Sequence, residues 1–376
     1  MINFVSHLPK DLRTGGFSAM NAAACAALER RHEVTYVGPV DPPPLLWQKA
    51  LSKGLRLSGL GGDFFAYSQR RLGAIAREVE RRAAPAAGLD FFHGFTYWVA
   101  TRPARPYVAW SDCVFADYIS IYHDRSAFRA DDLARIEAAE ARWLRGAARV
   151  LFTSDWAARR AVDAYGLDPA RVASVGIFGE FDPPEHDAFA GGARFAFVST
   201  NFAAKGGPTV LAALRLLRET HPEARLTIVG APPPEGLAEP GVDYVGFLRK
   251  EAPGECAALR DILASSVAVV HPTRSDIAPL LLVEAALFGC PAIASRAFAI
   301  PELVADGESG ALIDQPADAA EVAGAMRRML DHPQDYLALR AGAWRRARAL
   351  HAKAQFEARL AGHVADALAE PKAAAA

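Results

Sequence analysis

The stretch LASSVAVVHPTRSDIAPLLLVEAALFGCP, residues 263–291, predicts one strand, one loop and one helix in succession. The apolar run 263–270 is typical of a buried strand, and the run after Pro279 is typical of a helix buried on all sides. Within that helix stands Glu284, whose ionised carboxylate is costly to bury unless something hydrogen-bonds it. No Lys or Arg lies three or four residues away, so we expect a distant basic residue or a ligand to meet Glu284.

The rest of the chain repeats this alternation of strand and helix, which predicts parallel sheets covered by helices on both faces. The expected strands are 1–8, 32–39, 89–95, 106–112, 149–155, 194–200, 224–231, 242–248, 267–272 and 291–296. The expected helices are 17–31, 68–84, 131–148, 156–166, 208–221, 255–265, the run after Pro279, 300–307 and a final helical stretch from about 333 to 369. Asp131 or Asp132 is expected to cap one helix, and Ser154 or Asp155 another.

A segment rich in Pro, Gly and acidic residues, 179–194, interrupts this rhythm and is interpreted as a linker. We therefore predict an α/β fold with two doubly wound, Rossmann-like domains facing a cleft. The first domain spans 1–180 and the second 181–350, followed by a C-terminal helix and disordered tail over 351–376. Ligands of such sheets bind outside the carboxyl ends of the strands.

Composition limits the class of protein. A chain of 376 residues, 51% apolar and 23% charged, is globular and too long for one ordinary core. The N-terminal sequence lacks the pattern of a signal peptide, and no apolar run approaches the roughly 18 residues that span a membrane. The scattered cysteines Cys25, Cys113, Cys256 and Cys290 indicate a reducing compartment, so we expect a cytoplasmic protein, or one at the inner face of the membrane.

Charge is unevenly divided along the chain. Residues 1–178 carry 23 Lys and Arg against 18 Asp and Glu, whereas residues 179–376 carry 19 against 25. A basic first half suggests an anionic partner. Nucleic acid is not expected, because the basic residues form no single stripe and no nucleic-acid-binding motif is present.

Three predicted helix starts carry glycine or proline after a strand, at 205–208, at 273–279 and at 15–16. Backbone amides at a helix start bind anions, and Lys205 adds a positive charge to the first of these. Together they suggest a ligand with a diphosphate, although each alone is equally typical of a surface loop. Glu284 could then accept hydrogen bonds from a vicinal diol such as that of ribose, and Asp276 from sugar hydroxyls. The alternative is that Asp276 caps a turn and Glu284 pairs with a distant Arg.

These residues resemble the family-4 (group 1) retaining glycosyltransferases with the GT-B fold. The resemblance rests first on Asp276, seven residues, Glu284 and Ala285, followed by Gly289 and Pro291. It extends to the stretches 146–181, 205–217 and 300–313, to the glycine pair Gly15-Gly16, and to His93 at the end of a strand, so that it covers nearly the whole chain.

The resemblance implies a role for each matching residue. Lys205 would neutralise the donor diphosphate, Glu284 would hold the ribose, and Asp276 and His93 would contact the transferred sugar. Backbone amides around Pro279, Leu280 and Leu281, and those of Gly15 and Gly16, would surround the phosphates, with Thr200 also on the donor side; base contacts are expected near Phe247. The implied activity is a retaining hexosyl transfer from a nucleotide sugar. No cluster with metal-ligand spacing and no DxD triplet occurs, so neither a metal nor a cofactor is expected.

The chain departs from the family pattern at three places. Thr200 stands where the family usually has Arg, Ala204 where one branch has Arg, and Phe298-Ala299 where the family has Gly-Gly. These changes affect phosphate stabilisation and donor identity, and Arg274 or Arg296 could supply the second cation. For His93 the alternative is an ordinary hydrogen-bonded histidine at a strand end.

The acceptor, a glycan or a lipid-linked glycan, is expected at loops of the first domain, with Asp112 as a candidate contact. The stretch 45–65 mixes Leu and Trp with Lys and Arg and could lie on an anionic membrane, or pack on its own domain. Two other functions stay open from sequence: a nucleotide-sugar epimerase with the GT-B fold, and a non-catalytic member of a glycan-assembly complex.

Overall fold

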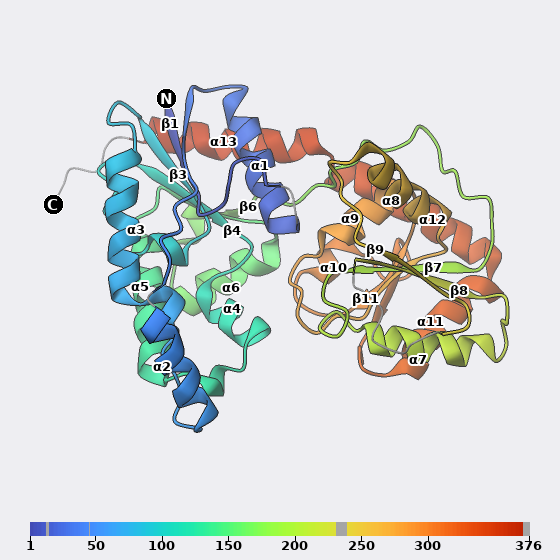
Figure 1. The fold of residues 1–376 in the computed structure, drawn as a ribbon. Helices are drawn as coiled ribbons and strands as arrows, with labels where there is room; N and C mark the ends of the chain where they lie inside the picture. The colour runs from blue at the N-terminus through green and yellow to red at the C-terminus, as the bar shows by residue number, and fades with distance from the viewer. Residues whose placement is uncertain (13–14, 45, 231–238, 371–376) are drawn as a thin grey trace. The chain divides into compact units, whose positions relative to one another are not determined.

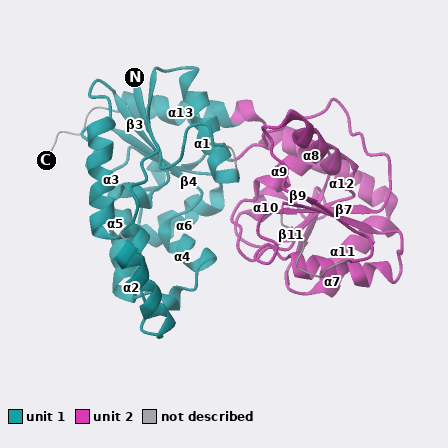
Figure 2. Cartoon of the chain, viewed as in Figure 1, with its two compact units in different colours: residues 1–176, 356–376 teal, residues 177–355 magenta. Residues whose placement is uncertain are grey.

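The computed structural model describes residues 1–12, 15–44, 46–230 and 239–370, and the chain forms two compact units (Figures 1 and 2). Unit 1 comprises residues 1–176 and 356–376, and unit 2 comprises residues 177–355. Each unit is built on a six-stranded sheet in which every pair of neighbouring strands is parallel. Leu45 and the tail predicted as disordered, 371–376, lie outside the described residues.

Unit 1 contains strands β1 to β6, and most of its helices also precede residue 176 in the chain. Its elements are β1 (Ile2–Val5), α1 (Gly16–Glu29), β2 (Val34–Val37), α2 (Leu46–Leu57), α3 (Gln69–Arg82), β3 (Leu89–His93), β4 (Tyr107–Ser111), α4 (Phe115–Tyr122), α5 (Ala130–Arg145), β5 (Arg149–Phe152), α6 (Asp155–Tyr165) and β6 (Val172–Ser174). Short 3-10 helices lie at Phe65–Tyr67, Thr96–Trp98, Arg125–Ala127 and Pro169–Arg171. The sheet order is β2-β1-β3-β4-β5-β6.

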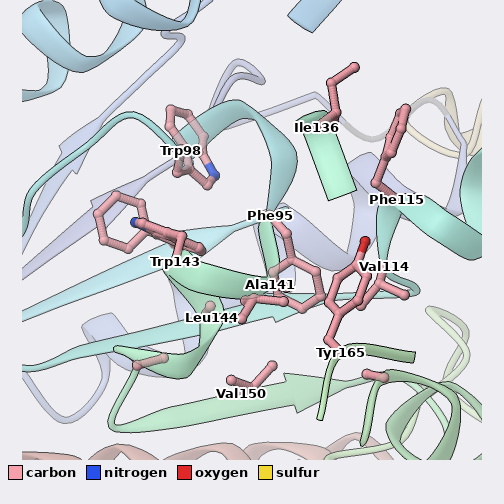
Figure 3. Packing of buried hydrophobic residues seen from close by; sticks show 14 of the residues in the cluster. Phe95, Trp98, Val114, Phe115, Ile136, Ala141, Trp143, Leu144, Val150 and Tyr165 are labelled. Carbon is pink, nitrogen blue, oxygen red and sulfur yellow. The ribbon is translucent and has the colours of Figure 1, made fainter. Parts of the chain in front are cut away.

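The core of unit 1 forms because its central strands are buried on both faces. Every residue of β1, β3 and β4 is buried, as expected for a parallel sheet between helices. Figure 3 shows part of this core, including Trp98, Phe115, Ile136, Trp143 and Tyr165, which belong to one buried cluster. Helices α5 and α6 thus cover the sheet with apolar faces.

The two predicted helix caps had different outcomes. Ser154 caps α6 as expected, since its hydroxyl accepts a hydrogen bond from the Ala157 amide at 3.2 Å. The prediction for α5 is wrong: the capping position is Arg129. Asp132 instead accepts a hydrogen bond from the Phe64 amide at 2.7 Å and pairs with Arg135, so a tertiary contact takes the carboxylate that local sequence assigned to capping.

Unit 2 contains the second sheet, with the order β12-β11-β10-β7-β8-β9. Its elements are β7 (Arg194–Ser199), α7 (Gly207–Arg218), β8 (Arg225–Gly230), β9 (Val242–Gly246), α8 (Pro253–Ser265), β10 (Val269–His271), α9 (Leu280–Leu287), β11 (Ala292–Ser295), α10 (Ile300–Leu303), β12 (Gly310–Ile313), α11 (Ala319–Asp331) and α12 (Pro333–Leu350). The predicted helical stretch 333–369 divides into α12 and α13 (Lys353–Ala369). From residue 356 onward α13 belongs to unit 1, where the Phe356 ring lies 5.7 Å from that of Trp110.

Each sheet has one point where the strand order reverses. In unit 1 the chain leaves β1 toward β2 and returns on the other side to β3, and in unit 2 it leaves β7 toward β8 and returns to β10. Loops that follow the two strands at such a point diverge and leave room for a ligand at the carboxyl edge. The residues that follow β1, β3, β7 and β10 are therefore the first candidates for a ligand-binding site.

Among the described residues, the structure has no helix long and apolar enough to cross a bilayer.

Candidate functional site

In unit 2, Lys205 and Asp276 meet at the reversal point of the sheet. Lys205 follows β7 and Asp276 follows β10, and the Lys205 ammonium lies 2.7 Å from Oδ2 of Asp276. The same ammonium donates a hydrogen bond to the Ser275 carbonyl at 2.6 Å. Two of the three predicted catalytic residues of this unit, Lys205 and Asp276 but not Glu284, are therefore in direct contact, although 70 residues separate Lys205 from Ser275 in sequence.

His271, the last residue of β10, completes this group. Its Nε2 lies 3.4 Å from Oδ2 of Asp276, and its ring is buried. Burial alone would raise the pKa of Asp276, but the neighbouring His271 and the Lys205 ammonium lower it below its ordinary value. Asp276 is therefore a carboxylate at neutral pH, able to accept hydrogen bonds from a ligand's hydroxyl groups while it orients Lys205.

The amides before α7 are not available as we predicted. The Lys205, Gly206 and Gly207 amides donate to the carbonyls of a turn formed by residues 201–203. Gly206 has φ +87°, and a Cβ there would collide with the Pro272 carbonyl, so the tight approach of the two loops requires glycine. At this helix start the Lys205 side chain, and not these three amides, is the group that can meet an anion.

The start of α9 does offer amides. Pro279 occupies the capping position of α9, and its carbonyl accepts a hydrogen bond from the Leu282 amide at 3.1 Å. The Leu280 and Leu281 amides have no acceptor among the residues that the structure describes. Because this helix follows the loop of Asp276, its positive end and the Lys205 ammonium both belong to the carboxyl edge of the sheet.

Glu284 meets a distant basic residue, which is a lysine and not the arginine considered above. It is 3% exposed, and its Oε1 pairs with the Lys250 ammonium, which also lies 3.0 Å from Oε2 of Glu180. Burial raises the pKa of Glu284, and the Lys250 charge only partly offsets that effect. Sequence analysis missed Lys250 and Glu180, because no periodic or motif signal links them to Glu284.

The other donor-side candidates also lie beyond strand ends. Thr200 follows β7 and is exposed, and Phe247 follows β9 with 49% of its surface exposed. Phe298, beyond β11, has φ +54°, a left-handed backbone that is rare for a residue with a side chain. Arg296 is already bound, because it pairs with Asp306 at 2.5 Å and Asp314 at 2.9 Å, which makes it a poor second cation.

In unit 1 the corresponding reversal point carries two histidines. His93 ends β3, and His7 lies two residues beyond β1. The His7 ring stacks on Tyr97 at 4.2 Å, and the Phe17 ring lies 4.2 Å from that of His93. Gly15, with φ +90°, and Gly16 are exposed at the start of α1, in the same chain segment as Phe17. Sequence analysis missed His7 and Tyr97.

The His93 ring is not the ordinary hydrogen-bonded histidine that sequence analysis left open. It is 1% exposed, and neither ring nitrogen has a hydrogen-bond partner among the described residues. Burial lowers the pKa of His93 well below its ordinary value, and likewise lowers the pKa of His7 to about 4. Both rings are therefore neutral at physiological pH, and a polar ligand atom would relieve the cost of the unpaired nitrogens.

The acceptor-side candidate Asp112 follows β4, and its Oδ1 lies 3.3 Å from the Ser111 hydroxyl. The segment after it is held by Glu140, a fully buried carboxyl that accepts hydrogen bonds from Thr96 at 2.6 Å and from the Phe115 amide at 2.6 Å. Burial raises the pKa of Glu140 to about 7. Sequence analysis also missed this buried acid, which looks like any surface position of an amphipathic helix.

The structure thus brings together Lys205 with Asp276 in unit 2, and places His93 and the Gly15-Gly16 pair around one reversal point in unit 1. Over the part of the chain that is described, no cluster of three or more His, Cys, Asp or Glu side chains has the arrangement of a metal site.

Comparison with known sequences matches part of the chain to one family. Residues 192–332 match the family model described as Glycosyl transferases group 1. A D-inositol 3-phosphate glycosyltransferase of Thermomonospora curvata is 29% identical over 233 residues, which is 54% of this chain and 54% of the relative. An MMP alpha-(1->4)-mannosyltransferase of Mycolicibacterium hassiacum is 35% identical over 147 residues, 37% of this chain and 34% of the relative. The chain spans about half the length of the curated relatives it matches, or less.

Comparison with solved structures covers nearly the whole chain. A sucrose-phosphate synthase from Thermosynechococcus elongatus superposes with a TM-score of 0.68 at 17% identity, covering 96% of this chain and 97% of the other. HepE of Anabaena, solved in complex with UDP, superposes with a TM-score of 0.63 at 17% identity, covering 97% and 99%. At such identities the likeness establishes the two-domain fold.

Proposed function

We propose that this chain, which is a group 1 glycosyltransferase with the GT-B fold, transfers a hexosyl unit from a nucleoside diphosphate sugar to a sugar or lipid-linked acceptor. The observation that carries the proposal is the contact of Lys205 with Asp276 at the reversal point of the second sheet. An ammonium and a carboxylate in contact there can meet a phosphate and a sugar hydroxyl side by side.

In this proposal the anomeric carbon loses its bond to the diphosphate and gains a bond to the acceptor oxygen on the same face, so the anomeric configuration is retained. The diphosphate oxygen takes the acceptor's proton as it leaves. Negative charge grows on the departing diphosphate, and the Lys205 ammonium and the α9 amides stabilise that charge more than they stabilise the ground state. Because these groups supply the positive charge, we propose that the transfer needs no metal ion.

The experiment that tests this proposal is a transfer assay with a panel of nucleoside diphosphate hexoses and simple glycoside acceptors. We expect release of nucleoside diphosphate that depends on acceptor, continues in excess EDTA, and yields a product whose anomeric configuration by NMR matches that of the donor. An inverted product would contradict the retaining mechanism, and loss of activity in EDTA would contradict the metal-free one. Turnover of the nucleotide sugar without any acceptor would favour the epimerase alternative, and no turnover at all the non-catalytic one.

Helix α2 supports a further part of the proposal, that the acceptor is lipid-linked and reached at an anionic membrane surface. The helix contacts its own unit through its polar edge, since the buried Ser52 donates a hydrogen bond to the Asp63 carbonyl at 2.6 Å. Its apolar side chains are exposed instead: Leu46 by 81%, Trp47 by 60% and Leu51 by 56%. The helix also carries Lys49, Lys53 and Arg56 and no acidic residue, a charge that complements anionic lipid.

Vesicle flotation measures this contact. We expect the wild type to float with phosphatidylglycerol vesicles at low salt and not with phosphatidylcholine vesicles. The double variant Lys49→Glu/Lys53→Glu should bind at least about tenfold more weakly, because each basic residue near such a surface contributes about 1 kcal/mol. Lys353→Glu, an exposed charge reversal at another helix, is the control. Absence of wild-type flotation on anionic vesicles would exclude the membrane contact.

A further inference from the structure

Three charged side chains of unit 2 converge from separate parts of the chain. Glu180 comes from the start of the unit, Lys250 from the loop beyond β9, and Glu284 from the middle of α9. The Lys250 ammonium pairs with both carboxylates and lies 5.3 Å from the centre of the Phe181 ring. Two carboxylates and one ammonium therefore meet in a largely buried place, where their mutual attraction must offset the cost of removing them from water.

The backbone near Glu180 is fitted closely to α9. A Cβ on Gly179 would lie 2.5 Å from Cδ1 of Leu287 and 3.3 Å from Cγ of Glu284. A side chain at position 179 would therefore require the Leu287 side chain to move, and glycine lets the 179–181 segment lie against the helix at the level of Glu284. The cluster is a built arrangement of three segments, and not a chance contact of long surface side chains.

The contacts of Glu284 are one-sided. Lys250 binds Oε1, and the Glu180 amide approaches the same oxygen at 3.5 Å. Its other oxygen, Oε2, accepts no hydrogen bond from any residue in the described ranges. A carboxylate held at one oxygen has a fixed orientation and presents the other oxygen for two further hydrogen bonds.

We propose that Lys250, anchored by Glu180, is a positioning residue of the nucleotide site: it holds Glu284 ionised through Oε1, so that Oε2 is presented to the vicinal hydroxyls of the ribose. This inference rests on the proposed function, because it takes a ribonucleotide as the ligand. It adds a residue that contacts Glu284 and not the donor, and it assigns the second oxygen of Glu284 to recognition of a diol, which donates two hydrogen bonds.

Among the charged groups around α9, Lys250 is the cation that faces Glu284. Glu284 is the only titratable residue on the helix. From α8, Arg260 lies over the Phe288 ring at 5.9 Å, and from α12, Arg340 donates to the Phe288 carbonyl while it pairs with Asp187. These groups lie at the carboxyl end of α9, beyond Glu284. Within the described residues, Lys250 and Glu180 are the charged side chains that face it.

The expected consequence is a pH dependence that becomes stronger when Lys250 is removed. Burial already raises the pKa of Glu284, and without the Lys250 charge the pKa rises further. Since the diol binds a carboxylate better than a carboxylic acid, nucleotide affinity of such a variant falls as pH decreases and recovers as pH increases. In the wild type the Lys250 charge offsets part of that rise, so we expect a weaker pH dependence of affinity over the same range.

Calorimetric titration with UDP, GDP, ADP and CDP, from about pH 6 to about pH 9, tests this. For the diphosphate that the wild type binds best, we expect Lys250→Met to bind about tenfold more weakly at the acid end and to recover toward wild-type affinity at the alkaline end. Lys250→Gln, which keeps a hydrogen-bond donor without the charge, should show the same profile if the methionine variant does not fold. Lys250→Arg should restore the wild-type profile.

Arg249→Met is the matched control, because it removes a positive charge from the adjacent position, where the side chain is exposed and binds Glu255. Its profile should follow the wild type. A profile no steeper than that of the wild type for Lys250→Met and Lys250→Gln, with wild-type binding intact, would overturn the positioning role and leave the proposed function standing. Failure of the wild type to bind any of the four diphosphates would overturn the proposed function, and this inference with it.

Discussion

Replacing Lys205 with alanine is expected to lower kcat for glycosyl transfer by about 10²- to 10³-fold, the usual loss when one group that stabilises a developing anion is removed. The structure gives the reason. Thr200 and Ala204 carry no charge, and the Lys205 ammonium is the cation that contacts Asp276 at the reversal point of the sheet. Its loss removes charge stabilisation that develops only as the diphosphate departs, so kcat should fall more than KM rises.

Two variants separate this role from a structural one. Lys205→Arg keeps the charge and should retain more activity than the alanine variant. Asp276→Asn keeps the shape and removes the carboxylate that orients Lys205, so it too should lower kcat. Thermal unfolding of each variant shows whether the fold is intact. A folded Lys205→Ala variant with nearly wild-type kcat would show that Lys205 does not act on the leaving group.

Replacing Arg340 with alanine is expected to destabilise unit 2 by about 3–5 kcal/mol, the cost of removing one member of a buried ion pair. Arg340 on α12 is 1% exposed and binds Asp187 through two hydrogen bonds of 2.6 and 2.5 Å. It also donates hydrogen bonds to the Ser266 and Phe288 carbonyls, at 3.1 and 3.0 Å. Replacing Arg340 with alanine therefore removes one hydrogen bond from each of these carbonyls.

Urea denaturation of wild type, Arg340→Ala and Arg345→Ala measures this effect. Arg345 lies on the same helix but is exposed, so its replacement should change the unfolding free energy by no more than about 0.5 kcal/mol. A destabilisation by Arg340→Ala of less than about 1 kcal/mol would mean that the segment around Asp187 is held to the helix by its other contacts.

The sequence was sufficient for the order of strands and helices, because apolar periodicity and turn residues are local signals. Short apolar runs place β1, β3, β4, β7 and β10 within the ranges expected for them. Local signals failed where a distant residue competed. Asp132 was expected to cap a helix, but the Phe64 amide, 68 residues away, takes its carboxylate.

The candidate site shows the same difference between local signals and contacts made by residues distant in the sequence. The positions of Lys205 and Asp276 were predictable because each follows a strand, whereas His93 was proposed from the family resemblance. The structure places all three at a reversal point of their sheets. The partner of Glu284 was not predictable from helical spacing, because Lys250 lies 34 residues earlier in the chain and reaches it only through the folded sheet. His7 and Tyr97, which stack at 4.2 Å, also meet only after folding.

In the proposed function, unit 2 binds a nucleoside diphosphate with Lys205 at the phosphates and Glu284 at the ribose. Its most direct test is calorimetric titration of the wild type, Lys205→Ala and Glu284→Ala with UDP, GDP, ADP and CDP, and with the 2′-deoxy form of whichever diphosphate binds. We expect the wild type to bind at least one diphosphate, both variants to bind it at least about tenfold more weakly, and the 2′-deoxy form to discriminate poorly between wild type and Glu284→Ala. Equal binding by the wild type and the two folded variants, or no binding by the wild type, would contradict this account.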